Sequence, residues 1–220
     1  MIIKTAILAT GGIDSTVLIY RAVKNNIKPT IITIDFGQAA FQKQKELLNK
    51  HIQKLNLDPL VIISIDFKHW QKTNGLFESN YIPEKEDLLE DLRYEEFFIE
   101  GRNAIMVLYT LAYCSNYKLD ELQAGYLYGE EEWTNRRAYK MITGDNSPHF
   151  VDIINLLSIT GFSHQIRFRA PFYESRMDKK DVIKEGIDLN IDLKNDTYSC
   201  YFIPECNKCD NCDLRNRYLK

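Results

Sequence analysis

The sequence has little net charge and no long hydrophobic run. Its 28 lysines and arginines nearly balance 31 aspartates and glutamates, which leaves a formal net charge of −3. No global basic field points to nucleic acid as a partner. The N-terminal apolar run from Ile2 to Ala9 is too short to span a bilayer and lacks the layout of a signal peptide. We therefore expect no membrane association and a cytoplasmic location with reduced thiols.

Histidine is also scarce, and the chain has no internal repeat or low-complexity segment. The four histidines show no spacing that would organise a Ser–His–Asp or Cys–His catalytic set. The 45% hydrophobic and 27% charged fractions are those of an ordinary globular protein. A chain of 220 residues can form one large domain, or one domain with a small appendage.

Apolar runs alternate with helical patterns along most of the chain. The expected strands are Ile2–Ala9, Thr30–Ile34, Leu60–Ile65, Glu121–Leu127 and Ile166–Ala170. The expected helices are Ser15–Asn25, Gln42–Leu57, Asn103–Asn116, Ser147–Ile159 and Asp178–Glu185. This alternation predicts an α/β fold in which a doubly wound parallel sheet is covered by helices. Continuous Ile/Val runs fit strands that are buried on both faces.

Two stretches depart from this rhythm. Residues 66–100 contain an acidic cluster, and we expect either a solvated surface excursion or a lid or substrate loop there. The tail from Thr197 onward has no strong periodicity. We expect a boundary near residue 190, with an α/β body over 1–190 and a small tail over 191–220 packed on it.

A glycine-rich turn follows Ala9 at the end of the first expected strand. It reads Thr10-Gly11-Gly12-Ile13-Asp14-Ser15-Thr16 and leads into a helix. The helix N-terminus offers free main-chain N–H groups, and glycines let phosphate oxygens approach the backbone. Ser15 and Thr16 add hydroxyl donors, while Asp14 can organise the loop or a metal ion. The alternative is an ordinary glycine turn with a helix cap; the Gly-Lys-Ser/Thr of a Walker A loop is missing.

Four of the five cysteines cluster near the C-terminus. Cys200, Cys206, Cys209 and Cys212 have the spacing Cys-x5-Cys-x2-Cys-x2-Cys. Four thiolates on tight turns form the closed tetrahedral shell of a structural Zn²⁺ site. An iron–sulfur cluster or unligated thiols are the alternatives. Cys114 lies in an apolar helical pattern, and we expect it to be a core residue.

Both ends of the chain resemble the 7-cyano-7-deazaguanine synthase family, whose members are PP-loop (N-type) ATP pyrophosphatases. The turn at 10–16 is similar to the family's Ser-Gly-Gly-x-Asp-Ser loop, with Thr10 in place of serine. The cysteine tail is similar as well. Other similar segments are Thr33-Ile34-Asp35-Phe36-Gly37-Gln38, Gly101-Arg102-Asn103, Pro171 with Asp178-Lys179, Thr197-Tyr198-Ser199-Cys200-Tyr201, and Arg215. The resemblance extends over nearly the whole chain.

The resemblance implies an adenine nucleotide alpha hydrolase-like, Rossmann-like fold and an ATP-dependent carbon–nitrogen ligase of queuosine biosynthesis. Such a ligase adenylates 7-carboxy-7-deazaguanine with ATP and Mg²⁺, and ammonia then displaces AMP. A second activation gives the nitrile. The implied catalytic residues are Asp14, Ser15, Arg102 and Lys179. The implied nucleotide-binding residues are Ala9, Thr10, Gly11, Gly12, Ile13, Asp14, Ser15, Thr16, Asp35, Gly101, Arg102 and Asn103. The family is often dimeric, so a homodimer is the protein partner to test.

The sequence departs from the family where the acid would be recognised. Residues 129–137 read Gly-Glu-Glu-Glu-Trp-Thr-Asn-Arg-Arg, which lacks the centre of the family's Asp-x-Ser-Gly-Tyr-Pro-Asp-Cys-Arg segment. Ala39-Ala40-Phe41 also replaces a more basic stretch. A divergent ligase that acts on another acid, modified base or peptide therefore stays open, with Trp133 and Arg137 as acid-binding candidates. A nucleic-acid-binding zinc knuckle is the third alternative, suggested by Lys208, Arg215, Arg217 and Lys220.

Overall fold

The computed structural model describes residues 3–67, 77, 99, 101–129, 147–207 and 209–219. The strands are β1 (Thr5–Leu8), β2 (Thr30–Asp35), β3 (Val61–Ser64), β4 (Glu121–Ala124) and β5 (Arg167–Arg169). The helices are α1 (Ile13–Lys24), α2 (Phe41–Lys54), α3 (Arg102–Tyr117), α5 (Pro148–Gly161), α6 (Pro171–Glu174), α7 (Lys179–Asp188) and α8 (Asp210–Tyr218). Among the described residues, no helix combines the length and the apolar character that a membrane span requires.

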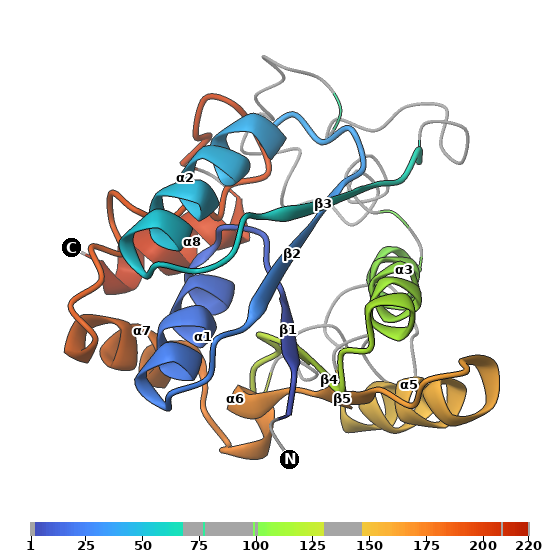
Figure 1. Cartoon of the computed structure of the whole chain (residues 1–220). Helices are drawn as coiled ribbons and strands as arrows, with labels where there is room; N and C mark the ends of the chain where they lie inside the picture. The colour runs from blue at the N-terminus through green and yellow to red at the C-terminus, as the bar shows by residue number, and fades with distance from the viewer. Residues whose placement is uncertain are drawn as a thin grey trace.

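The five strands form one parallel sheet in the order β3-β2-β1-β4-β5, seen in Figure 1. Ile7 of β1 pairs with Ile31 of β2 on one side and with Gln123 of β4 on the other. The chain moves outward from β1 to β3 and then returns to place β4 on the opposite side of β1. The carboxyl ends of β1 and β4 therefore lie at a topological switch point, where ligands bind in open α/β sheets. This arrangement confirms the predicted doubly wound parallel sheet.

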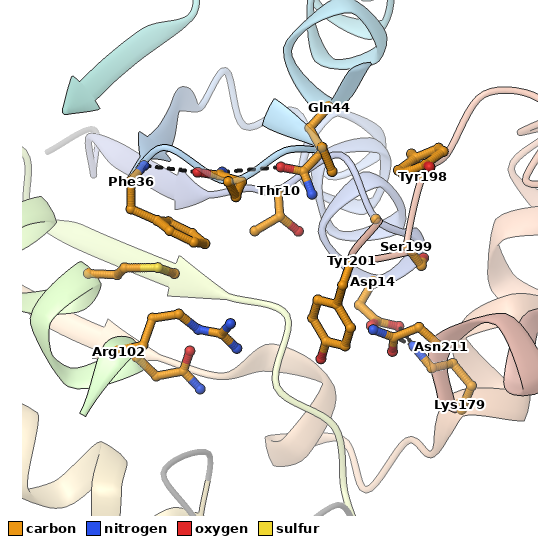
Figure 2. Close-up of a pocket in the computed structure, with 15 residues that line it drawn as sticks. Thr10, Asp14, Phe36, Gln44, Arg102, Lys179, Tyr198, Ser199, Tyr201 and Asn211 are labelled. Atoms are coloured by element: carbon orange, nitrogen blue, oxygen red, sulfur yellow. Dashed lines mark hydrogen bonds and ion pairs between the residues drawn. The ribbon is translucent and has the colours of Figure 1, made fainter. Parts of the chain in front are cut away.

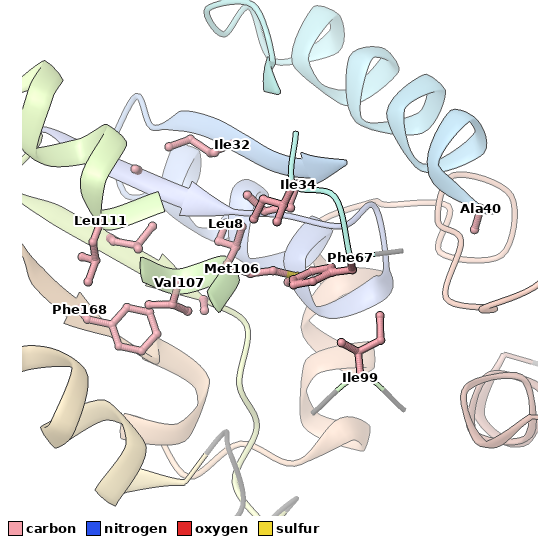
Figure 3. Packing of buried hydrophobic residues seen from close by; sticks show 14 of the residues in the cluster. Leu8, Ile32, Ile34, Ala40, Phe67, Ile99, Met106, Val107, Leu111 and Phe168 are labelled. Atoms are coloured by element: carbon pink, nitrogen blue, oxygen red, sulfur yellow. The ribbon is translucent and has the colours of Figure 1, made fainter. Parts of the chain in front are cut away.

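Side chains of the central strand alternate between two hydrophobic cores. Ile7 lies in a core with buried residues of α1, α2 and α7, including Val17, Leu48 and Val182. The other core contains Ala6 and Leu8 of β1, Ile32 and Ile34 of β2, Met106, Val107 and Leu111 of α3, and Phe168 of β5 (Figure 3). Both faces of β1 are covered, and this explains why its residues form a continuous apolar run.

The C-terminal tail belongs to these cores. Tyr198, Cys200 and Phe202 are buried in the core that contains Leu8. The tail ends in α8, a helix in a stretch whose sequence has no strong periodicity. The inward residues of α8 are a cysteine and an arginine, Cys212 and Arg215, so a search for apolar spacing does not find the helix.

Three predicted features differ from the structure or fall outside it. The strand expected over Glu121–Leu127 ends at Ala124. The expected excursion over 66–100 and the segment with Trp133 and Arg137 lie almost wholly outside the described residues. Cys114, expected to be a core residue, is fully buried in α3, and burial raises the pKa of its thiol to about 12.

Candidate functional site

A cavity of about 220 Å³ lies at the carboxyl end of the sheet, beside the start of α1 (Figure 2). Six of the predicted site residues line it: Thr10, Gly12, Asp14, Arg102, Asn103 and Lys179. They come from the β1–α1 turn and from the first residues of α3 and α7. Three helix N-termini therefore converge on one cavity, which is favourable for an anionic ligand.

The turn between β1 and α1 is folded tightly. Gly11 has a φ of +72°, and a Cβ built on it would lie 3.0 Å from the carbonyl oxygen of Gln44. The Ser15 hydroxyl donates to the Gly12 carbonyl and accepts from the Thr10 N–H, both at 3.3 Å. Ser15 therefore stabilises the turn from inside, while Thr10 and Gly12 face the cavity.

The remaining predicted residues of the turn are buried beside it. Ala9, Ile13 and Thr16 are at most 2% exposed. The Thr16 hydroxyl has no hydrogen-bond partner within the described part of the chain. These three side chains anchor the turn to the core, so any contact they make with a ligand in the cavity would be through their main chain.

The C-terminal tail holds the same turn from outside. The Tyr198 N–H donates to the Gly11 carbonyl at 2.8 Å. The Ser199 hydroxyl accepts from the Ile13 N–H at 3.4 Å. Tyr198, Ser199, Tyr201 and Asn211 all line the cavity. The tail thus forms one wall of the candidate site.

An ion pair lies at one end of the cavity. Lys179 Nζ is 2.6 Å from both carboxylate oxygens of Asp14, and these side chains are 17% and 27% exposed. Lys179 is fixed by the start of α7, where Asp178 and Asp181 form a capping box. The ammonium offsets the Asp14 charge, so the free N–H groups of α1 are not opposed by a net negative side chain.

A second cation lies across the cavity. Arg102 starts α3 directly after Gly101, which has a φ of +68° and shapes that turn. The guanidinium carbon lies 5.9 Å from the centroid of the Phe36 ring. In the described ranges, no carboxylate pairs with Arg102, so its donors remain available to a ligand.

Asp35 takes a different position from its predicted companions. Its carboxylate accepts from the Gly37 N–H at 2.9 Å and shapes the turn after β2. Its neighbours Phe36 and Gln38 line the cavity, whereas Asp35 is not among the lining residues. The observed contact of Asp35 is thus with the turn itself.

Several residues of the site were not found from the sequence. Gly125 follows β4, and a Cβ built on it would lie 3.2 Å from Cβ of Asp14. Gln44, Met106 and Asn211 line the cavity from α2, α3 and α8. A glycine inside the predicted strand Glu121–Leu127 was the available signal for Gly125; the other three carry no local signal.

The four tail cysteines form a compact buried cluster. Their sulfur atoms all lie within 4.8 Å of one another; the cysteines are Cys200, Cys206, Cys209 and Cys212. The sulfurs of Cys200 and Cys206 are 3.5 Å apart, and those of Cys206 and Cys212 are 3.9 Å apart. Main-chain N–H groups of Phe202 and Cys206 point at the Cys200 sulfur at 3.4 and 3.3 Å. This cluster could bind zinc, since four sulfurs at these spacings can surround a single ion.

Known proteins resemble the chain over nearly its full length. The family model described as queuosine biosynthesis protein QueC matches residues 4–220. A 7-cyano-7-deazaguanine synthase from Methanococcus maripaludis is 29% identical over 231 residues, which is 99% of this chain and 94% of the relative. One from Methanocaldococcus jannaschii is 25% identical over 228 residues, covering 97% of this chain and 93% of the relative.

Solved structures show the same fold at lower identity. The U34-tRNA thiolase NcsA from Methanococcus maripaludis, solved with its [4Fe-4S] cluster, aligns with a TM-score of 0.53 and 14% identity. The alignment covers 98% of this chain and 65% of the thiolase. At this identity the likeness concerns the fold alone.

Proposed function

The chain belongs to the QueC family of queuosine biosynthesis proteins, and from that premise we propose that it is an ATP-dependent carbon–nitrogen ligase of the 7-cyano-7-deazaguanine synthase type. The carboxylate of 7-carboxy-7-deazaguanine attacks the α-phosphorus of ATP, which releases pyrophosphate and forms an acyl adenylate. Ammonia then displaces AMP and leaves the amide. The amide oxygen then attacks the α-phosphorus of a second ATP, which releases a second pyrophosphate, and loss of AMP together with both amide N–H protons yields the nitrile.

The observation that carries this proposal is the convergence of anion-binding groups on one cavity. In an α-helix the first N–H groups have no intrahelical partner, and α1 begins with Ile13, Asp14 and Ser15, of which Ile13 donates to the Ser199 hydroxyl at 3.4 Å. Lys179 and Arg102 flank these amides from α7 and α3. Fixed dipoles and cations aimed at a departing pyrophosphate are the main stabilising groups such a reaction needs, since no protein nucleophile is involved.

Magnesium fits the same cavity. Asp14 supplies a carboxylate next to the proposed phosphate position. Mg²⁺ commonly takes only one or two carboxylates from a protein and completes its shell with phosphates and water. When bound, Mg²⁺ supplies positive charge to the leaving pyrophosphate. Lys179 orients the Asp14 carboxylate and contributes its own charge there.

For the cysteine cluster we propose Zn²⁺. A tetrahedral ion with Zn–S bonds of about 2.3 Å holds its sulfurs about 3.8 Å apart. The observed separations of 3.5 and 3.9 Å lie close to that value. A four-iron cluster places several metal atoms between the thiolates and needs a wider arrangement. The short sulfur distances therefore favour one ion, and reduced thiols suit the cytoplasmic location we propose.

A second candidate is a ligase of the same chemistry that acts on a different acid. Ala40 lies in the cavity wall and is 1% exposed. It stands in the stretch where the family is more basic, and the 129–137 segment also departs from the family. A site that has lost polar partners for its original substrate discriminates strongly against it. This second candidate keeps ATP and changes only the acid.

Acid-dependent ATP–pyrophosphate exchange separates the two candidates. We expect exchange with 7-carboxy-7-deazaguanine in a panel of acids, and AMP formation when ammonia is added. Lys179→Met should lower exchange by about 10² or more, because it removes a positive charge that stabilises the departing pyrophosphate. Lys180→Met is the matched control, since Lys180 is the next residue of α7 and is exposed.

The outcomes are distinct. Exchange with another acid alone supports the second candidate and ends the first. No exchange with any acid by folded, metal-loaded protein contradicts both. Equal losses in Lys179→Met and Lys180→Met would remove the specific role of Lys179.

A further inference from the structure

Gln44 lies directly above the β1–α1 turn. It is in the first turns of α2, and its main chain contacts the turn so closely that a Cβ on Gly11 would meet its carbonyl oxygen at 3.0 Å. Its side chain points from α2 into the cavity, near Thr10 (Figure 2). Gln44 is part of no motif that the sequence analysis identified.

The orientation of the Gln44 amide is fixed by Gln38. The Gln38 Oε1 accepts from the Phe36 N–H at 2.9 Å, and its Nε2 donates to the Ile34 carbonyl at 3.1 Å. These two main-chain partners settle which end of the Gln38 amide is the donor. The second N–H of Gln38 therefore meets the Oε1 of Gln44, at 3.3 Å.

This pairing leaves the Gln44 NH₂ group on the cavity side. The described residues offer it no acceptor, and Figure 2 shows the nitrogen directed into the cavity. A donor that is oriented by its neighbours but lacks a partner is suited to bind a ligand atom that only accepts.

Ala40 gives Gln44 the room to reach this position. Ala40 and Gln44 are four residues apart at the start of α2 and line the same cavity. Residues at this spacing lie on one face of a helix, so a larger side chain at position 40 would stand next to Gln44. The small alanine therefore leaves the Gln44 amide open to the cavity.

We propose that Gln44 is a nucleotide-binding residue whose Nε2 donates to a phosphate oxygen of ATP. The phosphate chain is the favoured acceptor because Gln44 sits against Gly11, in the turn whose amides face the same space. The role of Gln38 is positioning, since its amide is already engaged by Phe36, Ile34 and Gln44. This inference rests on the proposed use of ATP at this site.

Calorimetric titration of zinc-loaded protein with Mg-ATP tests the assignment. We expect Gln44→Met to weaken ATP binding about ten-fold, because a hydrogen bond to a charged oxygen is lost. Gln44→Glu should weaken binding further, since a carboxylate would face the phosphates. Gln42→Met and Gln42→Glu are matched controls from the exposed face of the same helix, and we expect wild-type affinity from both.

Separate probes identify the group that is bound. With inorganic pyrophosphate, Gln44→Met should bind more weakly than wild type, whereas adenosine binding should stay unchanged. The reverse pattern would overturn the phosphate assignment and give the amide to the base. Thermal melting and metal content verify that each variant is folded, and Gln44→Met keeps the test open if the glutamate variant does not fold.

Two kinds of failure remain distinguishable. If wild-type protein binds neither ATP nor pyrophosphate, the proposed function fails. If wild type binds ATP and the folded Gln44 variants bind it equally well, the function stands and the role of Gln44 is refuted.

Discussion

Gly11 shows how a single residue connects the turn to α2. Its φ of +72° belongs to the left-handed region, and a Cβ there would lie only 3.0 Å from the Gln44 carbonyl oxygen, closer than most side chains approach a backbone. The neighbouring Gly12 is less constrained, since a Cβ there would lie 3.5 Å from the hydroxyls of Thr10 and Ser199. The two glycines of the motif are therefore constrained in different ways. Gly11 is constrained by its left-handed conformation and by the Gln44 main chain, whereas Gly12 meets only two hydroxyl groups.

Gly11→Ala should lower both stability and ATP binding. The left-handed conformation and the contact with backbone atoms together should reduce the free energy of unfolding by about 2 kcal/mol. Urea denaturation measures this change. Gly161→Ala is the control, because a Cβ at Gly161 meets nothing within 4 Å, and we expect no loss there. Equal stability of Gly11→Ala and wild type would contradict the assigned turn.

His51 is a buried group that sequence spacing did not reveal. It is 0% exposed, and its Nε2 lies 2.7 Å from the Asp196 carbonyl oxygen. A carbonyl only accepts, so Nε2 carries the proton, and Nδ1 accepts from the Tyr20 hydroxyl at 3.0 Å. Burial lowers the pKa of His51 below its usual 6.5. His51 is therefore neutral in the folded protein and links α1 and α2 to the tail.

This lowered pKa predicts how stability changes with pH. As pH falls through about 6.5, the unfolded chain takes up a proton at His51 more readily than the folded chain does, so unfolding becomes easier as pH falls. His51→Gln loses packing and one hydrogen bond, and it should be less stable than wild type at pH 7.5. The difference in free energy of unfolding between the two proteins should narrow at pH 5.5, because only wild type is destabilised by protonation of His51. Denaturation curves at both pH values measure it.

The exposed His149→Gln variant controls for the loss of a histidine. We expect it to follow wild type at both pH values. A gap between His51→Gln and wild type that stays constant or widens on acidification would contradict the neutral state of His51.

Residues of the cavity wall can be found from the sequence where one local motif carries the signal. The turn residues Thr10, Gly12 and Asp14 are recognisable because they follow a strand and start a helix. Gln44 and Asn211 are not, because their place in the cavity depends on how α2 and α8 pack against that turn. Proximity between distant elements leaves no trace in the spacing of neighbouring residues.

The same contrast holds for whole elements. All five strands and the five longer helices of the described structure overlap their predicted ranges, because each has an apolar run or stripe that must be buried. The short α6 and the polar α8 lack that pattern. The strand order also could not be derived, since each strand only requires neighbours and does not specify them.

The helix α8 is held by polar contacts through Arg215. Arg215 is 8% exposed, and its side chain donates to the carbonyls of Thr197, at 2.8 Å, and Lys194. Both acceptors lie just before the segment that contacts Gly11 and Ile13. Arg215 therefore connects α8 to the wall of the cavity.

Arg215→Met should lower the free energy of unfolding by about 2–3 kcal/mol, because two carbonyls lose a charged donor. Urea denaturation provides the measurement. Arg217→Met in the same helix is the control: Arg217 pairs with Asp213 at the surface, where its side chain is 59% exposed, and we expect a change within about 0.5 kcal/mol. Similar losses in the two variants would contradict the special role of Arg215.

At the scale of the whole molecule, the two ends of the chain form one site. Ile13 and Ser199 are 186 residues apart in sequence and in hydrogen-bond contact. The cysteine cluster follows directly at Cys200, and Asn211 reaches the cavity from between Cys209 and Cys212. The metal we propose therefore fixes a wall of the cavity that we propose as the nucleotide site, which ties metal content to both stability and binding.

Cys209→Ser tests this connection. Loss of one thiolate should reduce the metal from one equivalent to well below one, lower the melting temperature and weaken ATP binding, because the wall formed by Ser199, Tyr201 and Asn211 loses its anchor. Elemental analysis, thermal melting and calorimetric titration measure the three effects on one preparation. Cys114→Ala is the control, since Cys114 is buried in α3 outside the cluster and should leave metal content unchanged. Full metal content in Cys209→Ser would remove Cys209 from the ligand set, and wild-type ATP affinity in folded, metal-free protein would separate the tail from the site.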